Sequence, residues 1–151
     1  MAEMRSKGHI TVATVNVRTL AGKLDLLLQE LKHVDVLCLQ ETRVSRDMAP
    51  GIIAKCARLG YQCVVGQSQT SKTDHVFGTN AVISKWPIAA VRGPAGPHFH
   101  RAQFFAIHDS QGGPIVVANI HGPYTMDNQF KFMRKVSSHL ASFGRRSFVD
   151  W

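Results

Sequence analysis

The chain alternates between apolar runs rich in β-branched residues and segments whose apolar residues recur at helical spacing. The first run, HITVATVNV from His9, is typical of a strand. Four leucines then share the spacing of one helix face, namely Leu24, Leu27, Leu28 and Leu31. A second apolar run, VDVLCLQ, follows that helix and predicts a buried strand beside the first.

A second helix is predicted after Pro50, which suits a first helical turn, and Gly60 is expected to end it. The run YQCVV then predicts a strand, and the polar segment from Gln67 to Asp74 predicts an exposed loop. Three further strand candidates follow at short intervals, namely TNAVISKW, AQFFAIHD and PIVVANIH. Their spacing favours antiparallel pairing between consecutive strands.

A last helix is predicted over about Asp127 to Phe143, because apolar residues recur there at helical spacing. Phe130, Met133 and Phe143 are expected to be core residues rather than stacking platforms. The final segment, RRSFVDW, has the pattern of a strand that is just beginning. The elements together predict a mixed α/β fold, in which helices flank a partly antiparallel sheet.

The size and composition of the chain fit one globular domain. Its 151 residues are 44% hydrophobic, which excludes disordered and fibrous classes. We expect residues 1–8 to be a flexible amino terminus and residues 9–151 to form the domain. The first residues, MAEMRSKGH, lack the apolar stretch of a secretory signal, and no apolar segment approaches the ~20 residues of a membrane span.

Cysteine usage favours a reducing environment. Cys38, Cys56 and Cys63 form no CxxC pair, and an odd number leaves one thiol unpaired in any disulfide scheme. The sequence therefore predicts a soluble, intracellular protein of the cytoplasm or the nucleus, without a membrane partner.

The net charge of +8 predicts a positive surface field that attracts polyanions such as nucleic acid. Arg43, beside a strand-end glutamate, is our candidate for a phosphate-binding cation. Other basic residues either extend a phosphate-binding face or are ordinary surface, namely Arg46, Lys72, Lys85, Arg92 and Arg101. Charge alone says nothing about chemistry.

Polar residues with chemical potential stand at the ends of three predicted strands. Asn16 closes TVATVN, Glu41 follows VLCLQ, and Asn119 and His121 close IVVANIH. A sheet fixes the backbone at such positions while the side chain can face a cleft. Taken alone, Glu41 is as well explained as a solvated charge, and Asn16 as a turn residue.

Four segments in order, TVNVRTL, DVLCLQETR, GTNAVISKWPI and VVANIHGP, resemble the endonuclease/exonuclease/phosphatase superfamily. NVRTL, KLDLLLQEL and LQETR are most similar in appearance to the endonuclease domains of non-LTR retroelements, and abasic-site endonucleases are also similar. The resemblance implies the first half of a four-layer α/β/β/α sandwich. It also implies hydrolysis of phosphodiesters with Mg²⁺, or with Mn²⁺ in its place, and a nucleic-acid substrate, with DNA favoured.

The resemblance also implies roles for individual residues. Glu41 matches the glutamate that binds the divalent metal. Asn16 would contact the scissile phosphate or orient a metal ligand. His121 would contact the phosphate or assist the leaving oxygen, and Asn119 would support it. Mg²⁺ keeps several waters and needs only one or two carboxylates, so Glu41 could serve as its main protein ligand.

Two motifs of the family are incomplete or missing. SFVDW resembles the start of an Asp-x-Asn motif, with Asp150 as its aspartate, and the Ser-Asp-His motif has no counterpart. The resemblance therefore predicts a fragment that lacks part of its active site. Half a sandwich would leave one sheet face unpartnered, so self-association through that face is expected.

Three other interpretations remain open. The chain could be a catalytically inactive half-domain that binds nucleic acid or a partner through its basic surface. It could also be a truncated product with no function of its own. The HxH pair His98 and His100 could suggest a metal site, but no third ligand stands at a useful spacing.

Overall fold

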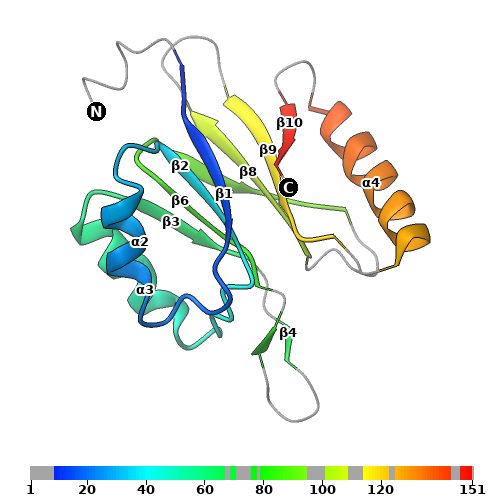
Figure 1. Ribbon diagram of the computed structural model, residues 1–151. Coiled ribbons are helices and arrows are strands. Elements are labelled where there is room, and N and C mark those ends of the chain that lie inside the picture. Colours follow the sequence, from blue (N-terminus) through cyan, green and yellow to red (C-terminus); the bar gives the residue numbers. More distant parts are fainter. Residues whose placement is uncertain are drawn as a thin grey trace.

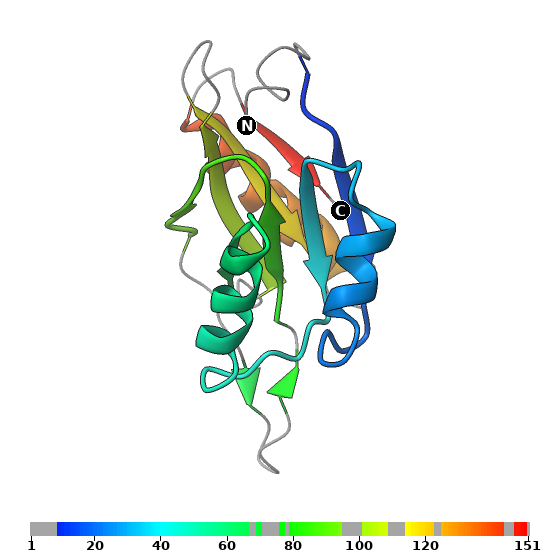
Figure 2. The ribbon, with the colours of Figure 1, turned by 90° about the vertical axis from the view of Figure 1, so that its left-hand side faces the viewer.

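The computed structural model describes residues 9–66, 69–70, 76–77, 79–94, 101–108, 114–122, 125–143 and 147–150. Within these ranges, two four-stranded sheets pack against each other, and helices cover both outer faces (Figure 1). Figure 2 looks onto the face covered by the first helices, with the two sheets behind them. The predicted mixed α/β class is confirmed.

The first sheet has the strand order β1-β2-β6-β3. Its members are β1 (Val12–Asn16), β2 (Val36–Gln40), β6 (Ala81–Ser84) and β3 (Gln62–Val65). β1 and β2 run parallel, and β6 lies antiparallel to both β2 and β3. Two helices, α2 (Leu24–Glu30) and α3 (Ala49–Arg58), cover the outer face of this sheet.

The second sheet has the strand order β10-β9-β8-β7. Its members are β10 (Ser147–Asp150), β9 (Pro114–Ile120), β8 (Ala102–His108) and β7 (Ile88–Val91). Only β9 and β10 run parallel. The helix α4 (Met126–Ala141) begins at the N-cap Thr125, whose side chain accepts from the Asn128 amide, and packs on the outer face of this sheet.

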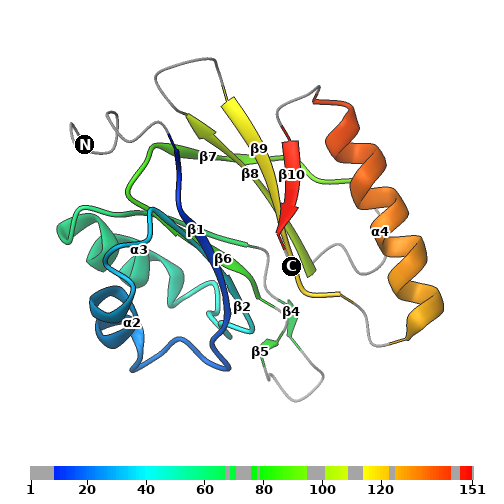
Figure 3. The same cartoon turned by 45° about the horizontal axis from the view of Figure 1, so that its top comes forward.

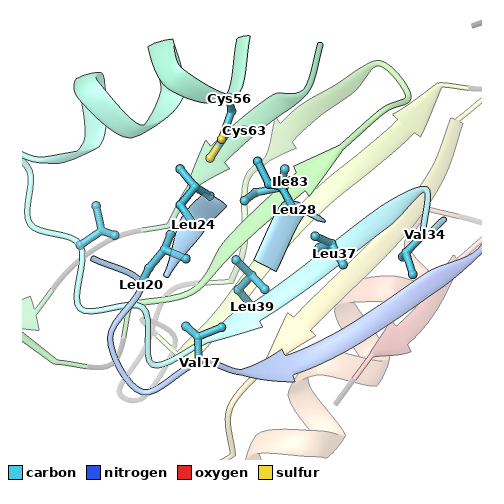
Figure 4. Packing of buried hydrophobic residues seen from close by; sticks show 11 residues of the cluster. Val17, Leu20, Leu24, Leu28, Val34, Leu37, Leu39, Cys56, Cys63 and Ile83 are labelled. Atoms are coloured by element: carbon cyan, nitrogen blue, oxygen red, sulfur yellow. The ribbon is translucent and has the colours of Figure 1, made fainter. Parts of the chain in front are cut away.

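Apolar side chains fill three layers. Leucines of α2 pack on β2 and β6 beneath the first pair of helices (Figure 4). Phe105 and Val117 of the second sheet meet Val36 and Cys38 of the first between the sheets. A third cluster holds α4 against β8 and β9. The three cysteines are buried free thiols, and Figure 4 shows the sulfur atoms of Cys56 and Cys63 close together.

The expectation of an unpartnered sheet face was wrong. The inner faces of the two sheets cover each other, because β6 joins the first sheet whereas β7 to β10 form the second. The predicted antiparallel pairing holds for β8 and β9 but fails for β6, which inserts between β2 and β3 of the other sheet. The strand β7 was not predicted.

The expected core position of two aromatic residues, Phe130 on α4 and Phe143 just after it, was also wrong. Phe130 is 67% exposed and Phe143 is 39% exposed, whereas Phe132 is buried. Consecutive helical residues are about 100° apart, so Phe130 and Phe132 stand on opposite sides of the helix. Phe132 shares the buried face with Val136 and Leu140, which leaves Phe130 outside.

Several predicted features fall partly or wholly outside the described residues, including residues 1–8, Lys72 and the histidines His98 and His100. The predicted loop from Gln67 to Asp74 contains the short strand β4 (Gln69–Thr70), which pairs with β5 (Val76–Phe77) beyond it. Among the described helices, none combines the length and the apolar character that a membrane span requires.

Candidate functional site

The candidate site lies where β1, β2 and β9 end. The parallel register places Asn16 beside Gln40, so the chain leaves both strands at the same edge. Glu41 follows β2 directly, and His121 follows β9 directly in the other sheet. Glu41 Oε1 lies 3.3 Å from His121 Nε2, and the two side chains are 25% and 22% exposed. The fold thus joins two predicted site residues from distant parts of the sequence.

Arg101 completes a chain of polar groups behind this pair. Its Nη1 lies 3.4 Å from His121 Nδ1 and 3.4 Å from the Gly122 carbonyl oxygen. The Arg101 carbonyl oxygen accepts a hydrogen bond of 2.8 Å from the His121 amide. These contacts fix the position of the imidazole between a guanidinium and a carboxylate.

The surroundings of His121 favour its neutral form. Burial lowers the pKa of the imidazole below its usual value, and the Arg101 guanidinium lowers it further, while Glu41 raises it. Nδ1 faces the cationic donor Arg101 and therefore acts as the acceptor. The proton of the neutral ring then belongs on Nε2, which donates toward Glu41.

The space between the sheets changes character just beneath these groups. Four strands, β2, β6, β8 and β9, present apolar residues between the sheets at every second position until their site ends, where an amide takes their place. We call these four buried residues the amide layer: Gln40, Asn80, Gln103 and Asn119. Glu41 and His121 lie next to the amide layer, just beyond the ends of β2 and β9.

Asn119 is the centre of the amide layer. Its Nδ2 group donates to the carbonyl oxygens of Leu39 and Ala81 in the first sheet, each at 3.1 Å, and to Gln103 Oε1 at 3.3 Å. Its Oδ1 accepts from Gln40 Nε2 at 2.8 Å. The fully buried Asn119 side chain therefore links β9 to both β2 and β6. Asn119 stands two residues before His121, and its acceptor Leu39 stands two residues before Glu41.

Asn80 and Gln40 extend the amide layer. Asn80 Nδ2 donates to the carbonyl oxygens of Arg101 and Asn119, at 3.0 and 2.9 Å. Gln40 Nε2 also donates to Thr14 Oγ1 at 2.8 Å. Buried amides are costly unless paired, so these hydrogen bonds fix how the two sheets meet at the site end, although Asn80 Oδ1 is buried without a described partner.

The backbone around Glu41 is strained. The φ angles of Glu41 and Arg43 are 52° and 54°, in the left-handed region that residues with side chains seldom adopt. The loop after β1 shows the same feature at Arg18 (46°) and Thr19 (88°). Thr19 donates to the Glu41 carbonyl oxygen at 2.7 Å, so the two strained loops support each other. Strain of this kind concentrates at functional sites.

The remaining predicted residues are placed as follows. Asn16 is exposed, its Oδ1 accepts from the Arg18 amide at 3.2 Å, and its Nδ2 donates to no other described residue. Arg43 is exposed in the same loop as Glu41. The Asp150 backbone lies in register with Asn119 on the parallel strand β10, and its side chain lies outside the described part of the structure.

The residues that support the site were not singled out from the sequence, including Asn80 and Gln40 of the amide layer. Arg101 was only one of several scattered basic residues, and Gln103 was not considered. The usable signal was the period of two along each strand: Gln103 precedes Phe105 and Ile107 at the spacing by which Asn119 follows Ile115 and Val117. An amide that ends such a row in several strands predicts a shared polar layer.

The donors of the site suit a hydrated divalent cation. No group of three His, Cys, Asp or Glu side chains among the described residues is placed to hold a metal ion. Structural zinc requires such a set, whereas Mg²⁺ accepts one carboxylate and retains waters. Glu41, partly exposed and directed to the strand ends, fits this second kind of ligand.

Comparison with known families agrees with this arrangement. The model of the endonuclease/exonuclease/phosphatase family matches residues 13–146, which is most of the chain. The chain belongs to this family. The match spans the four family segments noted in the sequence and ends just before the SFVDW run. No curated protein sequence matches the chain.

Solved structures share the family fold. A 3' phosphatase from Neisseria, bound to a product DNA hairpin, is 23% identical with a TM-score of 0.56, over 89% of this chain and 51% of its own. An AP endonuclease from Leishmania major is 21% identical with a TM-score of 0.53, over 89% and 45%. The human Nocturnin catalytic domain, with bound sulfate, is 17% identical with a TM-score of 0.51, over 87% and 60%. The chain spans about half the length of these structures.

Proposed function

We propose that this chain carries the metal-binding and phosphate-binding part of a divalent-metal-dependent phosphodiester hydrolase that acts on nucleic acid. The observation that carries the proposal is the 3.3 Å approach of Glu41 to His121 across two sheets. A carboxylate, a neutral imidazole and a guanidinium meet there next to the amide layer. Hydrolysis of a phosphodiester requires a bound cation, hydrogen-bond donors around the same oxygens, and a base.

Each of the three groups has a distinct role in this proposal. Glu41 would hold Mg²⁺ or Mn²⁺, and the cation, when bound, neutralises charge on the non-bridging phosphate oxygens. His121 would then turn its Nε2–H from the carboxylate to a phosphate oxygen. Arg101 keeps the imidazole oriented through Nδ1 and adds positive charge behind it. The exposed Asn16 amide, in register with Gln40 at the same sheet edge, would supply a further donor to the phosphate.

Asn119 would support His121, as its motif implies. Its side chain is fully buried and its amide is engaged by both sheets, so we assign it a positioning role beneath His121. Asp150 is proposed as the aspartate that orients the nucleophile, because its strand runs parallel to β9 at the site. Arg43 is proposed as a phosphate contact at the rim of the site.

Charge and family relatives favour a nucleic-acid substrate. The net charge of +8 attracts a polyanion, and two of the structural relatives are described as DNA-bound or as an AP endonuclease. We therefore propose DNA as the preferred substrate. The narrower similarity to retroelement endonucleases remains a prediction. The chain's length relative to these structures supports the proposal that it is part of a larger catalytic domain.

Plasmid nicking tests the proposal. Supercoiled plasmid is incubated with the wild-type protein in Mg²⁺ and in EDTA. It is also incubated in Mg²⁺ with Glu41→Gln and with the control Glu30→Gln, an exposed residue on α2. We expect nicking only in Mg²⁺, lost in Glu41→Gln and retained in Glu30→Gln. If no lane shows nicking while gel shifts persist, the hydrolase proposal fails for this chain. The second candidate, a nucleic-acid-binding module, would then stand on the positive charge.

A further inference from the structure

Two large apolar side chains are exposed one turn apart on α4. Met126 is 70% exposed and Phe130 is 67% exposed, although Phe132, Val136 and Leu140 on the same helix are buried. Among the described large hydrophobic residues, only Leu26 on α2 approaches this exposure, at 61%. Neighbouring exposed apolar residues of this size mark an interaction surface more often than isolated ones do.

The pair lies at the site end of the molecule. Met126 follows His121 by five residues, so the chain between them limits their separation to about 18 Å. Phe130 stands one turn further, about 6 Å along the helix axis. Figures 1 and 3 both show α4 beginning toward the end of the sandwich at which β1, β2 and β9 finish.

The charges around the pair suit a polyanion. Arg134 continues the row of Met126 and Phe130 at the next i+4 position, and Lys131 is exposed beside it. The helix carries Lys131, Arg134 and Lys135 against the single acid Asp127. Apolar faces bordered by cations match a ligand that has both flat apolar rings and phosphates.

We propose that Met126 and Phe130 form a stacking surface for the bases of an unpaired nucleic-acid strand whose phosphate lies at Glu41 and His121. The inference rests on the proposed function and narrows its substrate class. Bases within a continuous duplex are covered by their neighbours and cannot reach Phe130. A strand that is single, frayed or extruded can place a base there while its backbone continues toward the site.

Fluorescence anisotropy in EDTA measures binding without cleavage. The ligands are a labelled single-stranded oligonucleotide and a fully complementary duplex that contains the same strand. We expect Phe130→Ala to weaken single-strand binding about 5- to 150-fold, since a stacked base contributes about 1–3 kcal/mol. Phe130→Trp should restore binding, duplex affinity should change little, and the equally apolar control Leu26→Ala should bind as the wild type does.

Equal affinities of Phe130→Ala and the wild type for the single strand would overturn the stacking surface. If Phe130→Ala binds normally while Glu41-dependent nicking persists, the proposed function stands and only this inference fails. If the wild type binds neither ligand, the proposed nucleic-acid substrate fails with it. If light scattering shows a dimer that Phe130→Ala dissociates without loss of oligonucleotide affinity, the surface serves a second copy of this chain.

Discussion

The layer between the two sheets has two ends of opposite character. At the end remote from the site, Trp86, Ile88 and Ile107 pack as an apolar cluster. At the other end, the same rows of side chains finish in the amide layer, with Asn119 at its centre. Both ends are buried, but only one borders a carboxylate, an imidazole and a guanidinium.

The difference indicates that the apolar end mainly stabilises the fold, whereas the site end positions the candidate catalytic groups. Burial of apolar area at the remote end favours folding directly. Paired amides at the site end contribute little net free energy, because they exchange bonds to water for bonds to protein. The described non-glycine residues with positive φ also all belong to loops at the site end. The site end therefore holds its side chains in a defined arrangement but contributes less to the free energy of unfolding.

The largest effect is expected at the apolar end. Phe105→Ala should remove a fully buried ring and lower the free energy of unfolding by about 3–5 kcal/mol. Urea denaturation measures this change. The milder variant Phe105→Leu keeps the protein folded and should leave Mn²⁺ affinity unchanged. A loss of Mn²⁺ affinity in Phe105→Leu would contradict the division between the two ends.

A smaller loss of stability is expected at the amide layer, together with a loss of function. Asn119→Ala leaves buried partners unsatisfied, which costs about 1–3 kcal/mol. It should also weaken Mn²⁺ binding, since β9 is no longer tied to β2 beneath His121.

Ser84→Ala is the matched control for this variant. Ser84 is buried and bonded to the Trp86 backbone at the apolar end. It should lose stability but keep Mn²⁺ affinity. Equal Mn²⁺ affinities of Asn119→Ala and Ser84→Ala would refute the positioning role.

Relief of backbone strain should stabilise the site end. Arg43→Gly accommodates the φ of 54° and should raise the free energy of unfolding by about 1 kcal/mol, after the entropic cost of glycine is deducted. Arg46→Gly, at an exposed turn residue without positive φ, should lower it slightly. Thermal unfolding distinguishes the two, and a destabilised Arg43→Gly would show that the loop carries no such strain.

The smallest effect is a pH dependence from His121. Its pKa is lowered on folding, so the unfolded chain binds the proton more readily. Wild-type stability should therefore fall as the pH drops through the ordinary imidazole value of 6.5, and rise again toward neutral pH. His121→Gln should lose this component, visible as a shallower fall in Tm below neutral pH. A steeper fall in His121→Gln would reverse the assigned direction.

Much of the fold could be predicted from the sequence. The helices follow their apolar spacing, and Glu41 and His121 stand at the strand ends that the sequence indicated. Division of the strands between two sheets could not be predicted, because β6 and β8 have the same apolar character. The strand β7 was missed because Ala89 and Ala90 favour strands weakly.

The supporting part of the site was harder to predict. Arg101 follows a Pro- and Gly-rich segment and gains its meaning only when β8 and β9 pair and bring it to His121. The four amides meet only because particular strands face each other across the sandwich. The amino-acid sequence by itself does not specify which strands do so. The core position predicted for Phe130 was wrong because Phe130 and Phe132 are two residues apart, so only one of them can lie on the buried face of the helix.

Electron paramagnetic resonance of Mn²⁺ tests the central claim that the site end holds a cation on Glu41. The wild type should bind Mn²⁺, and Glu41→Gln should weaken binding roughly tenfold or more, equivalent to about 1.4 kcal/mol. Glu30→Gln, an exposed glutamate on α2, should bind as the wild type does. Equal Mn²⁺ affinities in the wild type and Glu41→Gln would contradict the account.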